Sequence, residues 1–287
     1  MWTDIATHIS QVTDSPFQVK HHRPVGGGCI NQAYALDGGD RAFFVKLNQA
    51  SQIGMFEAEA LGLKQIYQSQ TMRVPRPICW GITDSRSYLV LEWLNFGYGT
   101  HQSWEDMGRN LAAMHRVSSD RGFGWDQSNT IGATPQPNPW TQSWLDFFLE
   151  HRMAHQFRLA ARRGGNFPQQ AALMAAIPDL LAGHDPQPSL VHGDLWSGNA
   201  SVTVEGEPVI LDPATYFGDR EVDIAMTELF GRFPNEFYSA YQSAYPLDPG
   251  YDRRKTLYNL YHVINHFNLF GGGYESQANS MIASLLR

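Results

Sequence analysis

Hydrophobic and polar residues alternate in short runs along the first third of the chain, and glycines and prolines separate these runs. Such alternation is typical of β-strands with one buried face. It predicts strands at residues 17–25, 30–36, 41–47 and 87–94. Between the second and third of them, Asp37-Gly38-Gly39-Asp40 predicts a hairpin turn. Apolar positions at helical spacing then predict one helix at residues 53–70.

The rest of the chain follows a mostly helical pattern. Apolar spacing predicts helices at residues 104–117, 144–161, 222–230, 236–244, 258–270 and 277–286. Two short apolar runs, residues 190–192 and 209–211, indicate strands that lead into aspartates. We therefore predict an α+β fold of two lobes. A small β-sheet lobe with one helix spans residues 1–94, a larger, mostly helical lobe spans residues 95–287, and the acidic strand ends indicate a cleft between them.

Composition and charge narrow the class of protein. Of the 287 residues, 43% are hydrophobic and 17% are charged, which excludes a disordered, collagen-like or coiled-coil chain. The net charge of −7 leaves no surplus of cations to neutralise phosphates, so we expect neither nucleic acid nor a membrane as a partner. No secretory signal pattern and no apolar run of about 18 residues is present in the sequence. A soluble, cytoplasmic protein is expected.

The strongest chemical signal is His192-Gly193-Asp194-Leu195-Trp196-Ser197-Gly198-Asn199, followed by Val209-Ile210-Leu211-Asp212. The spacing matches a kinase catalytic loop, in which an aspartate accepts the proton of the substrate hydroxyl and an asparagine five residues later holds Mg²⁺. It assigns Asp194 as the general base, and Asn199 and Asp212 as Mg²⁺ ligands. Phosphoryl transfer needs this set because the transferring group carries dispersed negative charge. The plain alternative is a pair of solvated aspartates that cap helices or turns.

Groups suited to a nucleotide lie in the N-terminal region. Gly26-Gly27-Gly28, between two predicted strands, would let backbone N–H groups approach the phosphates of ATP. Lys46, which ends Phe43-Phe44-Val45-Lys46, resembles the lysine that pairs with the α- and β-phosphates in kinases. Glu57 and Glu59 on the next helix point about 200° apart, so only one can face Lys46. Glu59 is favoured, with Glu57 as the alternative.

Two further features are assigned to the adenine ring. Glu92-Trp93-Leu94, at the end of the last predicted strand, is the expected hinge whose backbone groups hydrogen-bond adenine. Phe44 shares a strand face with Lys46 and is expected to lie over the ring. A buried strand end and a core phenylalanine are the respective alternatives.

In this order, these features resemble the protein-kinase-like small-molecule kinases, to which the aminoglycoside phosphotransferases are related. Further segments are similar to the fructosamine (ketosamine 3-) kinase family, and the resemblance spans nearly the whole chain. The segments that carry it are Gly26-Gly27-Gly28-Cys29-Ile30-Asn31, Phe44-Val45-Lys46, Met55-Phe56-Glu57-Ala58-Glu59-Ala60, Thr134-Pro135-Gln136-Pro137-Asn138, His192 to Asn199, Asp212-Pro213-Ala214, Gly218-Asp219-Arg220-Glu221, Asp223-Ile224-Ala225-Met226 and Leu269-Phe270-Gly271. Unlike protein kinases, the chain has Pro213-Ala214 after Asp212 and no Ala-Pro-Glu segment, so control by a phosphorylated activation segment is not expected.

The resemblance implies ATP and Mg²⁺ as cofactors and, as acceptor, the C3 hydroxyl of a ketosamine, either a small molecule or bound to a protein. Phosphorylation would make the sugar adduct prone to leave the amine, which is a deglycation role. Trp196 is expected to stack on the acceptor sugar, since an aromatic face suits both sugar C–H groups and an amine cation. The alternatives are a kinase of another small alcohol (aminoglycoside, choline or homoserine) and a catalytically inactive nucleotide-binding scaffold.

Cys29 is the candidate for redox control. It follows three glycines, and their N–H groups together with the nearby Lys46 would favour a thiolate. The hypothesis is that oxidation blocks ATP binding or links two chains, so that the protein is a monomer or a redox-linked homodimer. The alternative is a small residue that fills space under the loop. Cys79, between Ile78 and Trp80, is expected to be buried and inert.

Overall fold

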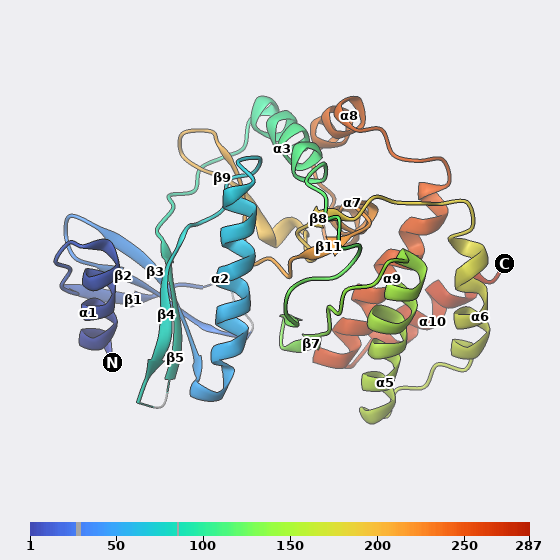
Figure 1. Ribbon diagram of the computed structural model, residues 1–287, viewed down its shortest axis with the longest axis horizontal. Coiled ribbons are helices and arrows are strands. Elements are labelled where there is room, and N and C mark those ends of the chain that lie inside the picture. Colours follow the sequence, from blue (N-terminus) through green and yellow to red (C-terminus); the bar gives the residue numbers. More distant parts are fainter. Residues whose placement is uncertain (27–29, 85) are drawn as a thin grey trace.

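The N-terminal part of the protein is built on an antiparallel sheet of order β1-β2-β3-β5-β4 (Figure 1). The structure is a computed structural model that describes residues 1–26, 30–84 and 86–287. Helix α1 (Trp2–Thr13) packs on one face of the sheet and α2 (Ile53–Gln68) on the other. The strands are β1 (His21–Pro24), β2 (Gln32–Asp37), β3 (Ala42–Gln49), β4 (Pro77–Thr83) and β5 (Arg86–Glu92), and a 3₁₀ turn (Ala50–Gln52) precedes α2.

Strand β3 shows how alternation divides the sheet into two faces. Phe43, Val45 and Leu47 are buried in the cluster that α1 covers. Phe44 packs against the cluster of the opposite face instead. The predicted hairpin between β2 and β3 is confirmed: Gly39 has a φ of 95°, and its N–H donates to Asp37 Oδ1 at 2.7 Å.

The C-terminal part is mostly helical, with short strand pairs between the helices (Figure 1). Helix α9 packs against α5, α7 and α10, and α3 packs against α8. The predicted α+β fold is thereby confirmed. The helices are α3 (His101–Met114), α4 (Trp144–Phe147), a π-helical segment (Phe148–Ala154), α5 (His155–Arg162), α6 (Gln170–Leu180), α7 (Glu221–Leu229), α8 (Asn235–Ala244), α9 (Tyr251–Phe270) and α10 (Tyr274–Leu285). The strands are β6 (Asn129–Ile131), β7 (Thr134–Gln136), β8 (Ser189–Val191), β9 (Ala200–Val202), β10 (Pro208–Ile210) and β11 (Tyr216–Gly218), and a 3₁₀ turn spans Ser197–Asn199.

The β9–β10 hairpin connects the two parts of the chain. The Ile210 N–H donates to the Arg73 carbonyl at 3.0 Å, next to the sheet. The Val204 N–H donates to the Asn95 carbonyl at 3.0 Å, and the Gly97 N–H to the Val202 carbonyl at 2.9 Å. The segment that follows β5 is thus tied to this hairpin by backbone hydrogen bonds.

Several elements differ from the sequence-based expectation. Helix α1, strand β4 and helix α6 were not predicted, and the strand predicted at 17–25 is reduced to β1. Strand β4 begins at Pro77, which is tolerated because β4 is an edge strand and its first residue needs no ladder N–H. Helix α9 begins at Tyr251, directly after Gly250 with a φ of 87°, whereas its apolar pattern becomes visible only at Leu257.

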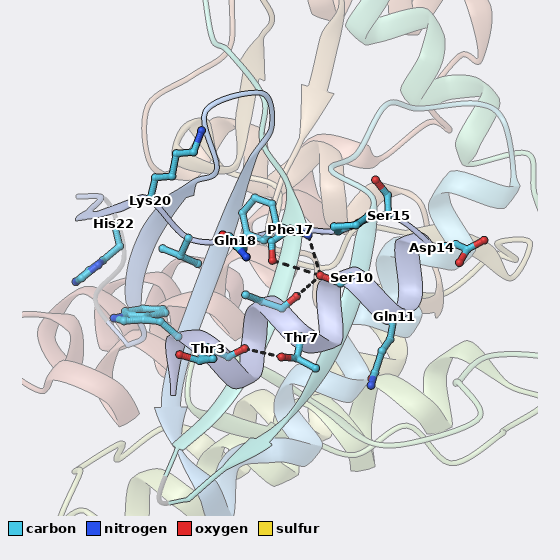
Figure 2. A pocket seen from close by; sticks show the side chains of 14 residues that line it. Thr3, Thr7, Ser10, Gln11, Asp14, Ser15, Phe17, Gln18, Lys20 and His22 are labelled. Atoms are coloured by element: carbon cyan, nitrogen blue, oxygen red, sulfur yellow. Dashed lines mark hydrogen bonds between the residues drawn. The ribbon is translucent and has the colours of Figure 1, made fainter.

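An open groove of about 850 Å³ lies along α1 and the segment that follows it (Figure 2). Ser10 links α1 to the segment that follows it. Its hydroxyl accepts a hydrogen bond from the Phe17 N–H at 2.8 Å and donates one to the Ala6 carbonyl at 2.8 Å. The groove is lined by side chains of α1, of residues 14–20 and of His22. It therefore belongs to the packing of α1. None of the helices within residues 1–26, 30–84 and 86–287 has the length and hydropathy of a membrane span.

Two glycines give a matched test of the packing. A Cβ on Gly108 of α3 would lie 2.3 Å from the Phe237 carbonyl oxygen of α8, whereas nothing lies within 4 Å of that position on Gly54 of α2. Gly108→Ala should lower the free energy of unfolding by roughly 1–3 kcal/mol, because α3 and α8 must move apart. Gly54→Ala should raise it by roughly 0.5–1 kcal/mol. Urea unfolding of both variants measures the difference, and equal effects would contradict the close helix contact.

Candidate active site

Strand β8 leads directly into the loop that carries Asp194. Gly193 has a φ of 82°, and a Cβ there would lie 2.3 Å from the Ala214 carbonyl oxygen, so the turn before Asp194 requires glycine. Asn199 Nδ2 donates to the Asp194 carbonyl at 2.9 Å and lies 3.4 Å from Asp194 Oδ2. The loop thus brings the predicted base and the predicted metal-binding amide into contact.

The backbone of the loop is held by Asp223 of α7. The Asp223 carboxylate accepts from the His192 N–H at 2.7 Å and from the Gly193 N–H at 2.8 Å. It also lies 3.1 Å from Nε2 of His115, and its side chain is 1% exposed. Asp223 lies in one of the family segments, and no role was predicted for it. No local spacing reveals this contact, because its partners come from the loop after β8 and from the end of α3.

Lys46 joins the two parts of the molecule. Its Nζ lies 2.7 Å from Glu59 Oε1 of α2 and 2.6 Å from Asp212 Oδ1, just after β10. Glu57 is exposed, so the structure pairs Lys46 with Glu59, the favoured candidate. Burial alone would lower the pKa of Lys46, but the Asp212 and Glu59 carboxylates raise it, and the ammonium group stays charged.

Burial raises the pKa of Asp194 to about 7, and the neighbouring carboxylates of Asp212 and Asp223 contribute to this shift. A carboxyl group with such a pKa can both take up and release a proton near neutral pH. Asp212 differs from Asp194 in that its side chain is 52% exposed and paired with Lys46. It also has a φ of 52°, in the left-handed region, which points to a functional constraint.

Asn199 and Asp212 offer the oxygen atoms that Mg²⁺ prefers. Within the described part of the chain, no hydrogen bond uses Asn199 Oδ1, since its amide nitrogen makes both contacts to Asp194. The Asp212 carboxylate is exposed enough to be reached from solvent. The donor set therefore fits a hard divalent cation.

The structure describes some, but not all, of the residues that were predicted to bind the nucleotide. Gly26 has open space where a Cβ would lie, and Phe44 is half-buried on the face opposite α1. Gly27 and Gly28 lie outside the described residues.

The hinge at Glu92-Trp93-Leu94 stays a prediction, and the structure shows which groups of Glu92 are already bonded. Its backbone N–H already donates to the Arg76 carbonyl at 2.9 Å, because β5 continues to this residue. Its carboxylate pairs with Arg73 at 2.7 Å. A contact to adenine would therefore use backbone groups of this segment other than the Glu92 N–H.

The Trp196 side chain lies beside the loop and is 37% exposed. Its ring covers Gly198, where a Cβ would lie 2.3 Å from the ring. The next residue, Ser197, donates its hydroxyl to the Phe230 carbonyl at 2.7 Å. The Phe230 ring packs against His266 with 4.5 Å between the ring centroids and the rings tilted by 43°. Of these three aromatic residues, only Trp196 was predicted from the sequence to contact the acceptor. Phe230 and His266 belong to segments that lie far from Trp196 in the sequence.

Of the two cysteines, only Cys79 lies within the described residues. Cys79 is buried in the α1 side of the sheet, and burial raises the pKa of its thiol to about 12, so its expected inertness is supported. Cys29 lies outside the described residues, and the redox hypothesis stays a prediction.

Comparison with known proteins identifies the family to which the chain is similar. The sequence profile of the fructosamine kinase family matches residues 1–287. The chain is 60% identical to a "Probable ketoamine kinase" of Synechocystis, over 100% of this chain and 97% of that protein. It is 44% identical to a chloroplastic protein-ribulosamine 3-kinase of Oryza sativa, over 92% of this chain and 78% of that protein.

Solved structures agree with this fold. The crystal structure of a candidate fructosamine-3-kinase from Haemophilus somnus superposes with a TM-score of 0.94 at 31% identity, over 100% of this chain and 98% of that one. An aminoglycoside phosphotransferase superposes with a TM-score of 0.65 at 16% identity, over 100% and 99% of the two chains, and shares the fold. With a family match over its full length, this chain belongs to the fructosamine kinase family.

Proposed function

We propose that this chain is an ATP-dependent kinase that phosphorylates a hydroxyl, expected to be that at C3, of a ketosamine and so begins deglycation. One observation carries the proposal: Lys46 joins Glu59 and Asp212 beside the loop that holds Asp194 and Asn199. This is the set of groups that phosphoryl transfer requires. Two relatives are named ketoamine kinase and protein-ribulosamine 3-kinase, which supports a ketosamine as the acceptor. Residues 1–94 would bind the nucleotide, and residues 95–287 the acceptor.

The residues divide the reaction between them. Asp194 accepts the proton of the acceptor hydroxyl as its oxygen forms a bond to the γ-phosphorus of ATP, and the bond from that phosphorus to the ADP oxygen breaks. Lys46, fixed by Glu59, neutralises charge on the α- and β-phosphates. Asn199 and Asp212 would hold Mg²⁺, which would supply further positive charge to the phosphates of the nucleotide. Asp223 keeps the loop in place throughout.

The acceptor is assigned to the aromatic side of the loop. Trp196 lies two residues after Asp194, and the adjacent Ser197 contacts the carbonyl of Phe230, whose ring packs against His266. A ketosamine presents sugar C–H groups and a secondary amine that is cationic when protonated, and both bind favourably to aromatic faces. An exposed aromatic face such as that of Trp196 thus suits both the sugar of a ketosamine and the amine that distinguishes it from a simple sugar.

Trp196→Ala should raise the KM for a ketosamine roughly 10-fold and leave the KM for ATP within about twofold, because the lost contact is to the acceptor alone. Trp196→Phe, which keeps an aromatic face, should recover most of the affinity. Steady-state kinetics with each substrate varied in turn gives both constants. A larger change for ATP would place Trp196 in the packing of the loop instead.

The proposed function is tested by ADP release across a panel of fructosamines, ribulosamines, choline, homoserine and aminoglycosides. Turnover of ketosamines is expected. Turnover confined to the other alcohols would indicate a different small-molecule kinase, and nucleotide binding without any turnover an inactive scaffold. The cytoplasmic location, and the choice between a monomer and a redox-linked homodimer, stay predictions, since the latter depends on Cys29.

A further inference from the structure

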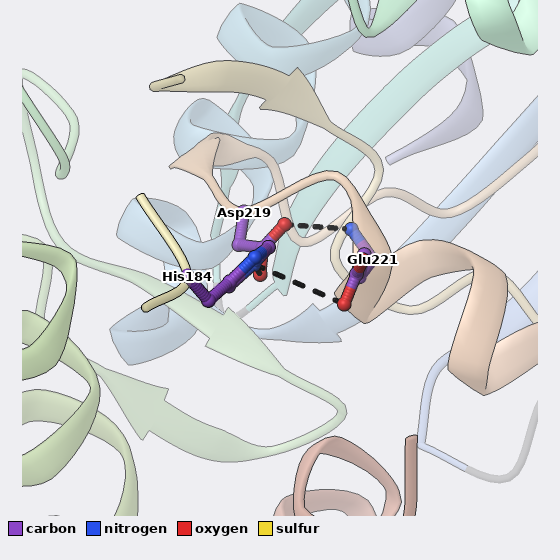
Figure 3. Close-up of side chains that lie close together, drawn as sticks. All are labelled: His184, Asp219 and Glu221. Carbon is purple, nitrogen blue, oxygen red and sulfur yellow. Dashed lines mark hydrogen bonds and ion pairs between the residues drawn. The ribbon is translucent and has the colours of Figure 1, made fainter. Parts of the chain in front are cut away.

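A group of buried charges lies one helical turn from the residue that holds the catalytic loop. His184 comes from the segment between α6 and β8, and its side chain is 2% exposed. Figure 3 shows it facing Asp219 and Glu221 at the start of α7. No role was predicted for His184, Asp219 or Glu221 from the sequence, and none of them takes part in the proposed reaction.

Both ring nitrogens of His184 face carboxylates. Nε2 lies 2.7 Å from Asp219 Oδ2, and Nδ1 lies 3.4 Å from Asp248 Oδ2, in the loop before α9. An ionised carboxylate only accepts hydrogen bonds, whereas a neutral imidazole has one donor and one acceptor nitrogen. Nε2 makes a hydrogen bond and Nδ1 an ion-pair contact, so carboxylates on both sides of the ring favour its doubly protonated, charged form.

The carboxylate of Asp219 is held in its ionised form. It accepts from the Tyr258 hydroxyl of α9 and from the Glu221 N–H at 3.0 Å, in addition to His184. These hydrogen bonds outweigh burial and lower the pKa of Asp219. A protonated Asp219, which would allow a neutral His184, is thus disfavoured.

The charges around the ring balance only when His184 is charged. Glu221 is held by Arg254 of α9, with N–O distances of 2.7 and 2.8 Å. Arg220 lies 4.0 Å from Asp248. Asp219, Glu221 and Asp248 then face Arg220, Arg254 and the imidazolium, three charges of each sign. Asp248 is 52% exposed, but the side chain of Asp219 is 1% exposed, so a neutral ring would leave a buried carboxylate facing an uncharged partner, which is costly.

The cluster is connected to the catalytic loop through α7. Asp219 Oδ1 accepts from the Glu221 N–H in the first turn of this helix. Two residues later, Asp223 holds the N–H groups of His192 and Gly193. Asp219 also follows β11, whose Gly218 pairs with Ser189 of β8, the strand that enters the loop.

We propose that His184 is a positioning residue, a buried imidazolium that fixes the first turn of α7 and thereby the Asp223–catalytic loop contact. The effect on catalysis rests on the proposed function, but the charged state of the ring does not. Burial alone would lower the pKa of His184, yet the hydrogen bond to Asp219 and the surrounding carboxylates raise it above 6.5. The stabilisation is therefore complete below about pH 6.5 and is lost as the pH rises through the higher pKa of the folded state.

A metal site is the competing explanation. Ligand atoms of His184, Asp219 and Glu221 lie within 4.8 Å of one another. Against it, Arg254 already occupies both oxygens of Glu221, and a cation there would have to displace a guanidinium group. An imidazolium also has no lone pair to give to a metal.

The experiment compares the wild type with His184→Gln, which can donate to Asp219 but carries no charge. The melting temperature of the wild type should exceed that of the variant below pH 6.5, and the gap should close as the pH rises to 9. Asp248→Asn, at a half-exposed position, should close the gap at a lower pH. His21→Gln, at an exposed histidine, should show no such pH dependence. A gap that is constant or widens with pH would overturn the proposal.

Two further readouts separate the alternatives. Nitrogen-15 spectra of the imidazole should show both nitrogens protonated at pH 7, without any substrate present, and a neutral ring would overturn the proposal. Stabilisation of the wild type but not of His184→Gln by Zn²⁺ at pH 7.5 would establish the metal site instead. In the kinase assay, His184→Gln should lower kcat roughly 10-fold with the KM for ATP little changed. An unchanged kcat would remove the positioning role.

Discussion

Replacement of Asp194 by alanine should lower kcat by roughly 10²–10⁴-fold, while the KM for ATP changes little. The loss follows from the geometry, because Asp194 stands next to Asn199 in the loop and no neighbour can replace it. Asp212 is engaged by Lys46, and Asp223 is engaged by two backbone N–H groups. Steady-state kinetics with ATP and a ketosamine gives both constants.

Two control variants accompany Asp194→Ala: one keeps the size of the side chain at position 194, and the other removes a carboxylate elsewhere. Asp194→Asn keeps the side-chain volume and should be nearly as inactive, since an amide does not accept the proton. Asp252→Ala removes a carboxylate that is 93% exposed on α9 and should leave kcat unchanged. A near-normal kcat for Asp194→Ala in a folded protein would end its assignment as the base.

Lys46→Met should lower kcat/KM for ATP by roughly 10²–10³-fold, because the phosphates lose a fixed positive charge. It should also destabilise the fold, since it leaves the Glu59 carboxylate largely buried without its partner. The double variant Lys46→Met/Glu59→Gln removes that carboxylate and should regain stability without regaining activity. Thermal unfolding and kinetics on both variants separate the two effects.

Recovery of activity together with stability in the double variant would mean that Lys46 acts only through the fold. Lys20→Met, which removes an exposed lysine from the same part of the chain, is the matched control and should change neither quantity.

The features that could be predicted from the sequence are those set by local periodicity. Alternation along β3 places Phe44 and Phe43 on opposite faces of the sheet, as the structure shows. The 100° step of a helix separates Glu57 from Glu59 and leaves one of them for Lys46. The catalytic loop is recognisable because its residues are close together in the sequence.

What could not be predicted depends on contacts between distant segments. Asp223 of α7 contacts both the catalytic loop and His115 at the end of α3, and His184 lies against carboxylates from two other loops. The Glu92 N–H is another example. It donates to the carbonyl of Arg76, from a segment whose position relative to β5 is set by the fold, while the hinge itself stays a prediction. Helix α1 was missed because its apolar face is narrow, with only Ile5, Ala6 and Ile9 buried.

The central claim, transfer of phosphate to a ketosamine hydroxyl, is tested most directly by a proton–phosphorus correlation spectrum of the reaction product. The protein is incubated with ATP, Mg²⁺ and a fructosamine, and in a second sample with a ribulosamine. We expect a new phosphorus signal coupled to the proton on C3 of the sugar, absent in the Asp194→Ala sample. A spectrum in which ATP yields only inorganic phosphate, or in which the new phosphorus couples to a proton other than that on C3, would contradict the proposed reaction.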